Sequence, residues 1–127
     1  MSNDIAKLLL RLSVGVMMLF HGLDKIINGI DGVKHLLVSA GAPQFLAYGV
    51  YVGEVVIPIF IILGVYVRAA SVILGLNMVA AIFLAYGGAL FSLGKHGAPV
   101  FELPFLYLMM SVIIFMLGSG KYALNSK

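Results

Sequence analysis

The sequence predicts an all-α protein, an integral membrane four-helix bundle with a short interfacial helix between helices one and two. The first observation is composition: of 127 residues, 62% are hydrophobic and only 10% are charged, whereas a soluble domain is about 45–50% apolar and about 25% charged. The other observations are four long apolar stretches and the position of most charges at their ends. Such a small number of charged residues cannot cover the surface of a water-soluble fold of this size. Lipid must therefore form part of the solvent around the protein. We expect one domain over residues 1–127.

Each apolar stretch predicts one membrane-spanning helix. A span needs about 20 predominantly apolar residues, and about 17 is the usual lower limit. The fourth stretch is short by that count, so we expect its helix to extend over Phe101 and Glu102 into the interface. The predicted spans are Ile5–Ile27, Phe45–Val67, Ala69–Phe91 and Leu103–Leu117.

The first stretch has a signal peptide as its alternative interpretation, because Lys7 and Arg11 precede an apolar core. No small-x-small cleavage site follows it, so we expect an uncleaved helix. After it, the segment 28–32 contains two glycines and breaks the helix. Val33–Ala40 then has an amphipathic pattern, which predicts a short helix in the membrane interface.

The second stretch contains Pro58 near its middle, which predicts a kink just after Glu54. Gly49 and Gly53 form a Gly-x-x-x-Gly step, for which we favour packing within the bundle over a dimer contact. A tight turn near Arg68 leads into the third stretch. The third connection, residues 92–100, is longer and rich in glycine.

The charges predict an orientation. Four spans place both termini and the Arg68 turn on one side of the membrane. That side carries five basic residues against three on the other, which favours cytoplasmic termini. The basic residues are scattered rather than clustered, so we expect no nucleic-acid partner. The five are Lys7, Arg11, Arg68, Lys121 and Lys127, and the three are Lys25, Lys34 and Lys95.

The chain has no cysteine. Disulfides, thiolate metal sites and a dithiol relay within the chain are therefore excluded. The three histidines lie far apart in sequence, and we predict no metal site. No cofactor is evident from the residues, so any redox chemistry needs a bound carrier or another subunit.

Ionisable residues at membrane depth are costly and need a partner or a function. Depth, counted at about 1.5 Å per residue along each helix, places His21 and Glu54 in the same layer. Lys25 reaches the same layer, so we expect Glu54 to pair with His21 or Lys25. Arg11 falls in another layer, where it contacts Asn77 or extends to lipid phosphate.

Further polar and aromatic residues approach the layer of Glu54 from the other helices. Together they form a candidate ligand-binding pocket, with no catalytic residue assigned. The alternative is structural: a buried ion pair, ordinary interfacial tyrosines, and Glu102 at a helix N-terminus, where the backbone dipole favours an acid. The candidate residues are His21, Lys25, Tyr51, Glu54, Tyr86, Glu102 and Tyr107.

Several short motifs are spread over nearly the whole chain. They are Leu10-Arg11-Leu12, Gly15, Phe20-His21-Gly22-Leu23-Asp24-Lys25, Gly41-Ala42-Pro43, Glu54, Gly64-Val65-Tyr66-Val67-Arg68 and Gly118-x-Gly120-Lys121-Tyr122. In these motifs the chain resembles the DoxX family of small four-helix bacterial membrane proteins. It departs from the family at Ala123-Leu124-Asn125, where the family pattern ends in Ser-Leu-Asp.

The resemblance implies a multi-pass protein of the bacterial inner membrane with a redox-associated role. Members are linked to membrane redox systems, including a quinone-reducing thiosulfate oxidation complex and oxidative-stress assemblies. The leading hypothesis is a membrane subunit that binds a quinone-like amphiphile in an outer-leaflet pocket. The alternatives are a non-enzymatic scaffold or anchor for a partner oxidoreductase, and a small proton or solute transporter. The sequence does not decide whether the chain binds an oxidoreductase partner, soluble or membrane-bound, or whether it forms a homo-oligomer.

Overall fold

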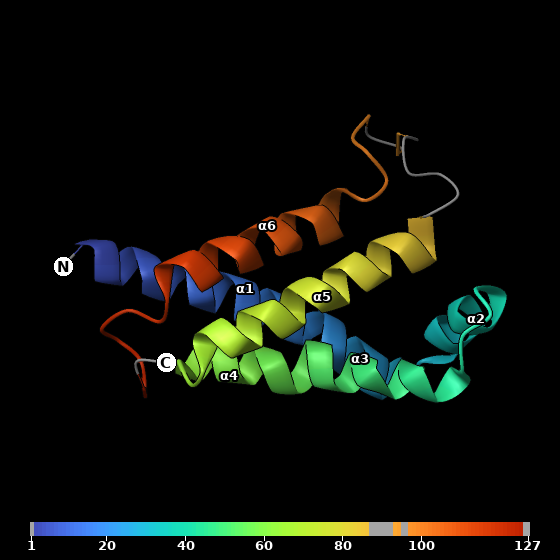
Figure 1. The fold of residues 1–127 in the computed structure, drawn as a ribbon, viewed down its shortest axis with the longest axis horizontal. Helices are drawn as coiled ribbons and strands as arrows, with labels where there is room; N and C mark the ends of the chain where they lie inside the picture. The colour runs from blue at the N-terminus through green and yellow to red at the C-terminus, as the bar shows by residue number, and fades with distance from the viewer. Residues whose placement is uncertain (1, 87–92, 95–96, 126–127) are drawn as a thin grey trace.

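The chain folds as a membrane helical bundle (Figure 1). The computed structural model describes residues 2–86, 93–94 and 97–125. Within those residues the only β pairing is one isolated bridge between Leu93 and Pro99. The helices are α1 (Ser2–Asn28), α2 (Asp31–Ser39), the 3₁₀ helix η1 (Gln44–Tyr48), α3 (Gly49–Tyr51), the π-helix η2 (Val52–Val56), α4 (Ile57–Leu63), α5 (Val67–Tyr86) and α6 (Glu102–Leu117).

Three helical runs are long and apolar enough to cross a membrane: α1, the continuous run Gln44–Leu63 and α5. The fourth, α6, has 16 residues and is as short as predicted. It begins at Glu102, and Phe101 is its N-cap. The predicted third span reached Phe91, whereas α5 ends at Tyr86 and residues 87–91 lie outside the described part.

The predicted second span continued to Val67, but its helix ends at Leu63. Gly64 takes the left-handed conformation, with φ of 77°, and ends α4. Tyr66 also has a positive φ, of 46°, and α5 begins at Val67. A left-handed glycine is a common way for a helix to end, so the turn comes earlier than hydropathy alone suggested.

The run Gln44–Leu63 is irregular around Glu54. It starts as 3₁₀ helix and widens into the π-helix η2 immediately before α4, where Pro58 lies in the first turn. Pro58 has no N–H, so the carbonyl of Glu54, four residues earlier, lacks its usual α-helical donor. Single π-helical turns inside α-helices occur mostly at functional sites. The sequence predicts a kink at this point, and the structure shows a change of helix type centred on Glu54.

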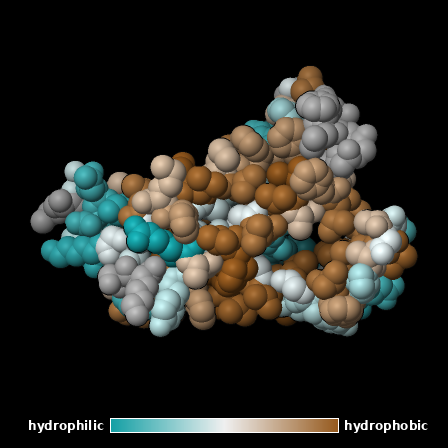
Figure 2. Space-filling model, in the orientation of Figure 1, coloured by the Kyte–Doolittle hydropathy of each residue, from teal (hydrophilic) through white to brown (hydrophobic). Residues whose placement is uncertain are grey.

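Two helix pairs make the most extensive contacts in the bundle. α5 packs chiefly on α6, and α1 packs on α4. The outward faces carry large apolar side chains, which appear as the brown surface in Figure 2, as expected for contact with lipid. The buried core comprises Val14, Met18, Ile57, Ile61, Val67, Ala70, Leu74, Met78, Tyr107 and Ile114.

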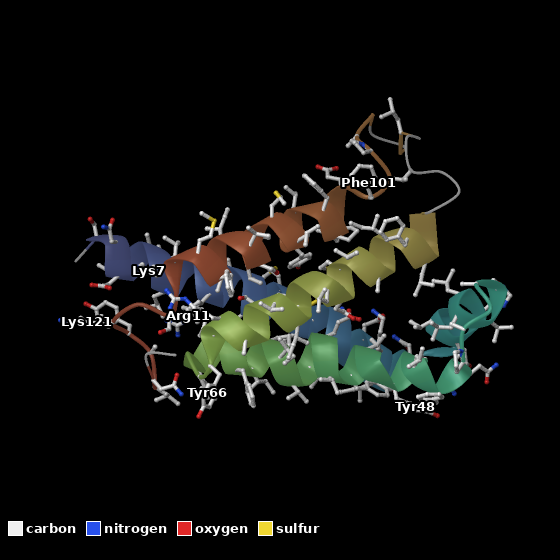
Figure 3. All side chains as sticks on the ribbon, viewed as in Figure 1. Lys7, Arg11, Tyr48, Tyr66, Phe101 and Lys121 are labelled. Atoms are coloured by element: carbon white, nitrogen blue, oxygen red, sulfur yellow. The ribbon has the colours of Figure 1, made fainter. Side chains whose placement is uncertain are left out.

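Both termini and the turn between α4 and α5 lie at one end of the bundle, which we call the terminal end; α2 lies at the opposite end, which we call the α2 end (Figure 1). Arg11 is 1% exposed at the terminal end. Its guanidinium donates to the backbone carbonyls of Ile61, Ser119, Tyr122 and Ile62 at 2.9–3.0 Å. The segment after α6 therefore folds back over the helix ends (Figure 3).

Neither sequence-based expectation for Arg11 is correct. It contacts neither Asn77 nor the membrane surface, because chain-end carbonyls satisfy the guanidinium inside the protein. The returning segment is held further by Asn125. Its side-chain oxygen accepts from the backbone N–H of Tyr66 at 3.1 Å. An amide therefore fills the position where the family pattern has an acid.

Gly22 sets the contact between α1 and η2. A Cβ atom at Gly22 would overlap the carbonyl oxygen of Glu54 and lie 2.7 Å from the Val55 side chain. Only glycine lets the two backbones approach this closely without a shift. This contact holds Glu54 beside the last turns of α1.

Candidate functional site

A cavity of about 500 Å³ lies in the half of the bundle nearer α2. Figure 2 shows the surface hollowed near α2. By the helix directions, its lining residues nearest the terminal end are Met18, Glu54, Asn77, Met78 and Tyr107, which we call the floor. The complete lining is Met18, His21, Lys25, Val33, Leu36, Leu37, Leu46, Gly49, Val50, Glu54, Asn77, Met78, Ala80, Ala81, Leu84, Ala85, Leu103, Pro104 and Tyr107.

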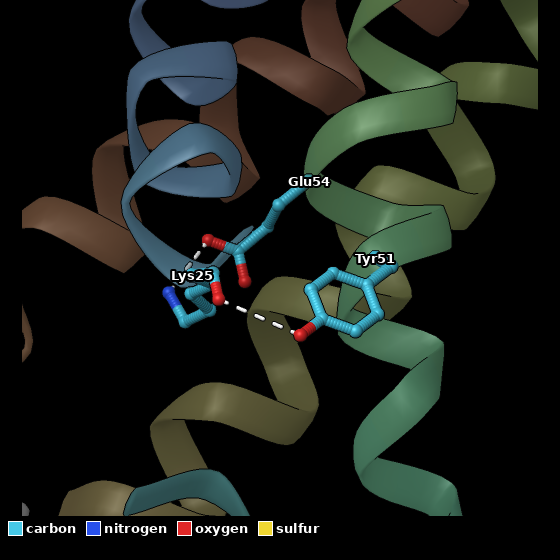
Figure 4. A network of polar contacts seen from close by, with 3 residues as sticks. All are labelled: Lys25, Tyr51 and Glu54. Atoms are coloured by element: carbon cyan, nitrogen blue, oxygen red, sulfur yellow. Dashed lines mark hydrogen bonds and ion pairs between the residues drawn. The ribbon is translucent and has the colours of Figure 1, made fainter. Parts of the chain in front are cut away.

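An ion pair lines the cavity and includes one residue of its floor, Glu54. Lys25 Nζ is 3.0 Å from Glu54 Oε1 (Figure 4). Glu54 is 7% exposed, whereas the Lys25 side chain keeps 24% of its surface exposed. The pairing predicted from helix depth is confirmed, with Lys25 as the partner. A buried carboxylate beside an ammonium group can stay ionised at membrane depth.

His21 lies one turn before Lys25 on the same face of α1, as the helical period requires. Its ring packs edge-on against Tyr107 of α6, with 5.9 Å between centroids and an interplanar angle of 90°. Tyr107 is 5% exposed. Among the described residues, neither ring nitrogen of His21 has a hydrogen-bond partner, so both are available to a molecule in the cavity.

Tyr51 does not line the cavity. Its ring packs against a small apolar cluster under α2, formed by Ile30, Leu37 and Ala47. Its hydroxyl donates to the Lys25 backbone carbonyl at a long 3.5 Å (Figure 4). The structure therefore places Tyr51 behind the ion pair, where it contacts the backbone that carries Lys25.

The two remaining predicted residues are not brought into the cavity by the described structure. Glu102 is exposed at the first turn of α6 and does not line the cavity. An acid at this position is favourable for the helix dipole alone. Tyr86 ends α5, and its side chain lies outside the described part.

Asn77 is the cavity residue whose place was predicted wrongly. Depth counting set it near Arg11, but it lines the floor of the cavity instead. It shares one face of α5 with Ala80, Ala81 and Leu84. The signal in the sequence was a lone amide in the middle of an otherwise apolar helix. Depth alone could not show which way it points.

The cavity therefore offers three kinds of hydrogen-bonding group within an apolar wall. Lys25 donates, the carboxylate of Glu54 accepts, and the imidazole of His21 and the amide of Asn77 can each do both. Small-molecule sites commonly have this character, mostly apolar with a few convergent polar groups. Within the described residues, no three His, Cys, Asp or Glu side chains gather as metal ligands would.

Comparison with known proteins identifies the family of this arrangement. The DoxX family model matches residues 6–87. The chain belongs to the DoxX family. It is 30% identical to a Bacillus subtilis protein named "Putative oxidoreductase CatD", over 98% of this chain and 87% of that protein. It is also 30% identical to an uncharacterised Haemophilus influenzae protein, over 93% of this chain and 87% of the relative. No solved structure matches the chain significantly.

The DoxX match and the apolar helices together make this a multi-pass membrane protein. The matched range runs from α1 to the end of α5. It therefore contains the ion pair, His21 and Asn77, whereas Tyr107 lies beyond it. Most of the polar groups of the cavity thus belong to the part of the chain that defines it as a DoxX protein.

Proposed function

We propose that this DoxX protein is a redox-associated membrane subunit that binds a quinone-like amphiphile in the cavity at the α2 end. The observation that carries the proposal is a cavity of about 500 Å³ lined by a buried Lys25–Glu54 ion pair. Intramembrane ionisable groups that face a cavity commonly mark a ligand or proton site. The relative named as an oxidoreductase supports a redox setting.

The polar groups suit the two oxidation states of such a ligand. Lys25 and His21 can donate to a ring carbonyl, and Glu54 can accept from a ring hydroxyl. His21 and Glu54 can also exchange the protons that accompany quinone reduction. The chain has no cysteine, and we propose that a soluble or membrane oxidoreductase partner supplies the electrons.

The shape of the cavity favours ligand binding over the two alternatives. A pure scaffold needs no internal cavity and would gain stability by packing its centre. A transport path would have to continue through the bundle. In the half near the termini, a buried core that includes Ile61, Leu74 and Ile114 lies between the helices instead. A cavity that ends against this core suits a molecule that binds there rather than one that passes through.

The distribution of basic residues sets the proposed orientation. Lys7 and Lys121 lie at the terminal end (Figure 3), and so does Arg68 in the first turn of α5. By the positive-inside rule this end faces the cytoplasm of a bacterial inner membrane. The cavity then lies in the outer half of the bilayer. Substrate amphiphiles would reach it from the outer leaflet, beside α2.

The proposal is tested by quinone binding to purified protein in lipid nanodiscs. We expect saturable binding of a short-chain benzoquinone that weakens about tenfold or more in His21→Ala, which removes a donor to the ring carbonyl. Binding of the corresponding hydroquinone should weaken similarly in Glu54→Gln, which replaces the anionic acceptor of the ring hydroxyl with a neutral amide. Glu102→Gln is the matched control, since Glu102 is exposed and outside the cavity. Equal affinity in all four proteins would exclude this site.

A further inference from the structure

Asn77 occupies an unusual position for an amide. It is the eleventh residue of the 20-residue helix α5. At about 1.5 Å per residue, it lies roughly 15 Å from the start of α5, near the middle of a hydrocarbon core about 30 Å thick. The helix around it is apolar on nearly every side. A carboxamide at this depth is costly unless it has a hydrogen-bonding partner.

The described part of the protein does not supply that partner. Within it, the Asn77 side chain makes no hydrogen bond, and no buried side-chain nitrogen or oxygen is left unsatisfied. The amide therefore opens onto the cavity, whose floor it forms with Met18, Glu54, Met78 and Tyr107. Whatever occupies the cavity must complete its hydrogen bonds.

Gly53 makes the space for this side chain. A Cβ atom at Gly53 would lie 2.8 Å from Cγ of Asn77, and 3.0 and 3.1 Å from its oxygen and nitrogen. No other residue type at position 53 would leave the amide where it is. Gly53 belongs to the π-helix η2, next to Glu54. The same irregular turn thus accommodates both the carboxylate and the amide.

We infer that Asn77 binds an oxygen of the ligand head group at the floor of the cavity, so that the ligand class is an amphiphile whose oxygen-bearing ring enters first. This inference rests on the proposed function. An amide donates through its nitrogen and accepts through its oxygen. It therefore holds a ring carbonyl and a ring hydroxyl equally, whereas ionised Glu54 binds only the hydroxyl form. Asn77 keeps the ring in place in both oxidation states.

The test compares two ligands that differ in their ring oxygens. A decyl-substituted 1,4-benzoquinone and decylbenzene are titrated into the purified protein in phosphatidylcholine nanodiscs. In Asn77→Leu, we expect quinone affinity to fall about tenfold, as for the loss of one buried hydrogen bond, while decylbenzene affinity stays the same. Asn3→Leu, the same substitution at an exposed site outside the cavity, should change neither affinity.

A second variant and an infrared spectrum distinguish the loss of the Asn77 hydrogen bond from a folding defect in Asn77→Leu. Gly53→Ala leaves Asn77 in the chain but displaces its amide, so quinone affinity should fall there too. The infrared stretch of one bound carbonyl should be lowered in the unaltered protein and return toward its free value in Asn77→Leu. Unchanged quinone affinity and an unchanged spectrum in Asn77→Leu would overturn the role of Asn77 alone. No preference for quinone over decylbenzene in the unaltered protein would overturn the proposed function and this inference together.

Discussion

At the scale of single residues, Glu54 is the group that most needs an explanation. It is 7% exposed in a membrane bundle, and an isolated carboxylate there would be strongly unfavourable. Lys25 supplies the compensating charge at 3.0 Å. Because the Lys25 side chain is partly exposed and both residues line the cavity, the ion pair is not fully buried in the core. Both charges are therefore accessible to a ligand in the cavity.

Removing one member of this pair should cost more than removing both. Glu54→Gln leaves the Lys25 ammonium without its counter-ion, and we expect it to lower the free energy of unfolding by about 1–3 kcal/mol. Lys25→Met should lower it similarly. The double variant should lose less than the sum of the two, because neither charge is then left unpaired. Unfolding in mixed micelles with increasing dodecyl sulfate measures these values.

Glu102→Gln is the control for that cycle, since Glu102 is exposed and lies outside the pair. Its effect on the free energy of unfolding should be small. If the losses in Glu54→Gln and Lys25→Met simply add in the double variant, the ion pair is not a coupled unit in the membrane.

At the scale of elements, the contact between α1 and η2 positions the site. Gly22 allows α1 to lie directly on the backbone of Glu54. The π-helical turn and Pro58 leave the carbonyl of Glu54 without its usual α-helical donor. The geometry of the ion pair therefore depends on Gly22, a glycine located three positions before Lys25.

Replacing Gly22 tests this dependence. Gly22→Ala would push α1 away from η2, and we expect a loss of about 1–3 kcal/mol in the free energy of unfolding, typical of overpacking. Quinone binding should weaken in parallel. Gly32→Ala in α2 is the matched control, because a Cβ there meets nothing within 4 Å. If thermal unfolding shows the same midpoint for both variants, the close approach at Gly22 does not hold the site together.

The elements also show what sequence could and could not predict. Hydropathy was enough to place α1, α5 and α6, and depth counting limited the partner of Glu54 to His21 or Lys25, of which Lys25 is the one that forms the ion pair. Depth does not define the rotation of a helix about its axis. Because α5 is apolar on nearly every side, nothing in its pattern indicated that Asn77 faces the cavity. Tyr51 was placed in the cavity wall, but it instead fills the cluster under α2.

The terminal end was the least predictable part for a related reason. Arg11 binds carbonyls of Ile61 and Ile62 at the end of α4 and of Ser119 and Tyr122 after α6. The last two lie in an irregular segment that returns over the bundle. Such a segment has no hydrophobic period from which its path could be derived. An arginine within the first apolar stretch was visible in the sequence, but its partners are backbone carbonyls, which every residue carries.

At the scale of the whole molecule, the bundle is divided into two halves with different physical character. The terminal half contains most of the buried core, and the guanidinium of Arg11 ties its chain ends together. The α2 half contains the cavity, the ion pair and an amide that has no hydrogen-bond partner among the described residues. A buried core that holds the helices and a cavity that accepts a ligand are what a binding site on a stable scaffold requires.

Photolabelling tests this division most directly. The protein in nanodiscs is irradiated with an azido-substituted decyl benzoquinone, and the labelled peptides are mapped by mass spectrometry. We predict labels on the cavity wall, within α1 near His21 and within α5 near Asn77, and their loss when excess unlabelled quinone competes. Labels spread over the lipid-facing residues of all helices, undiminished by competition, would contradict the claim that the cavity binds a quinone-like amphiphile.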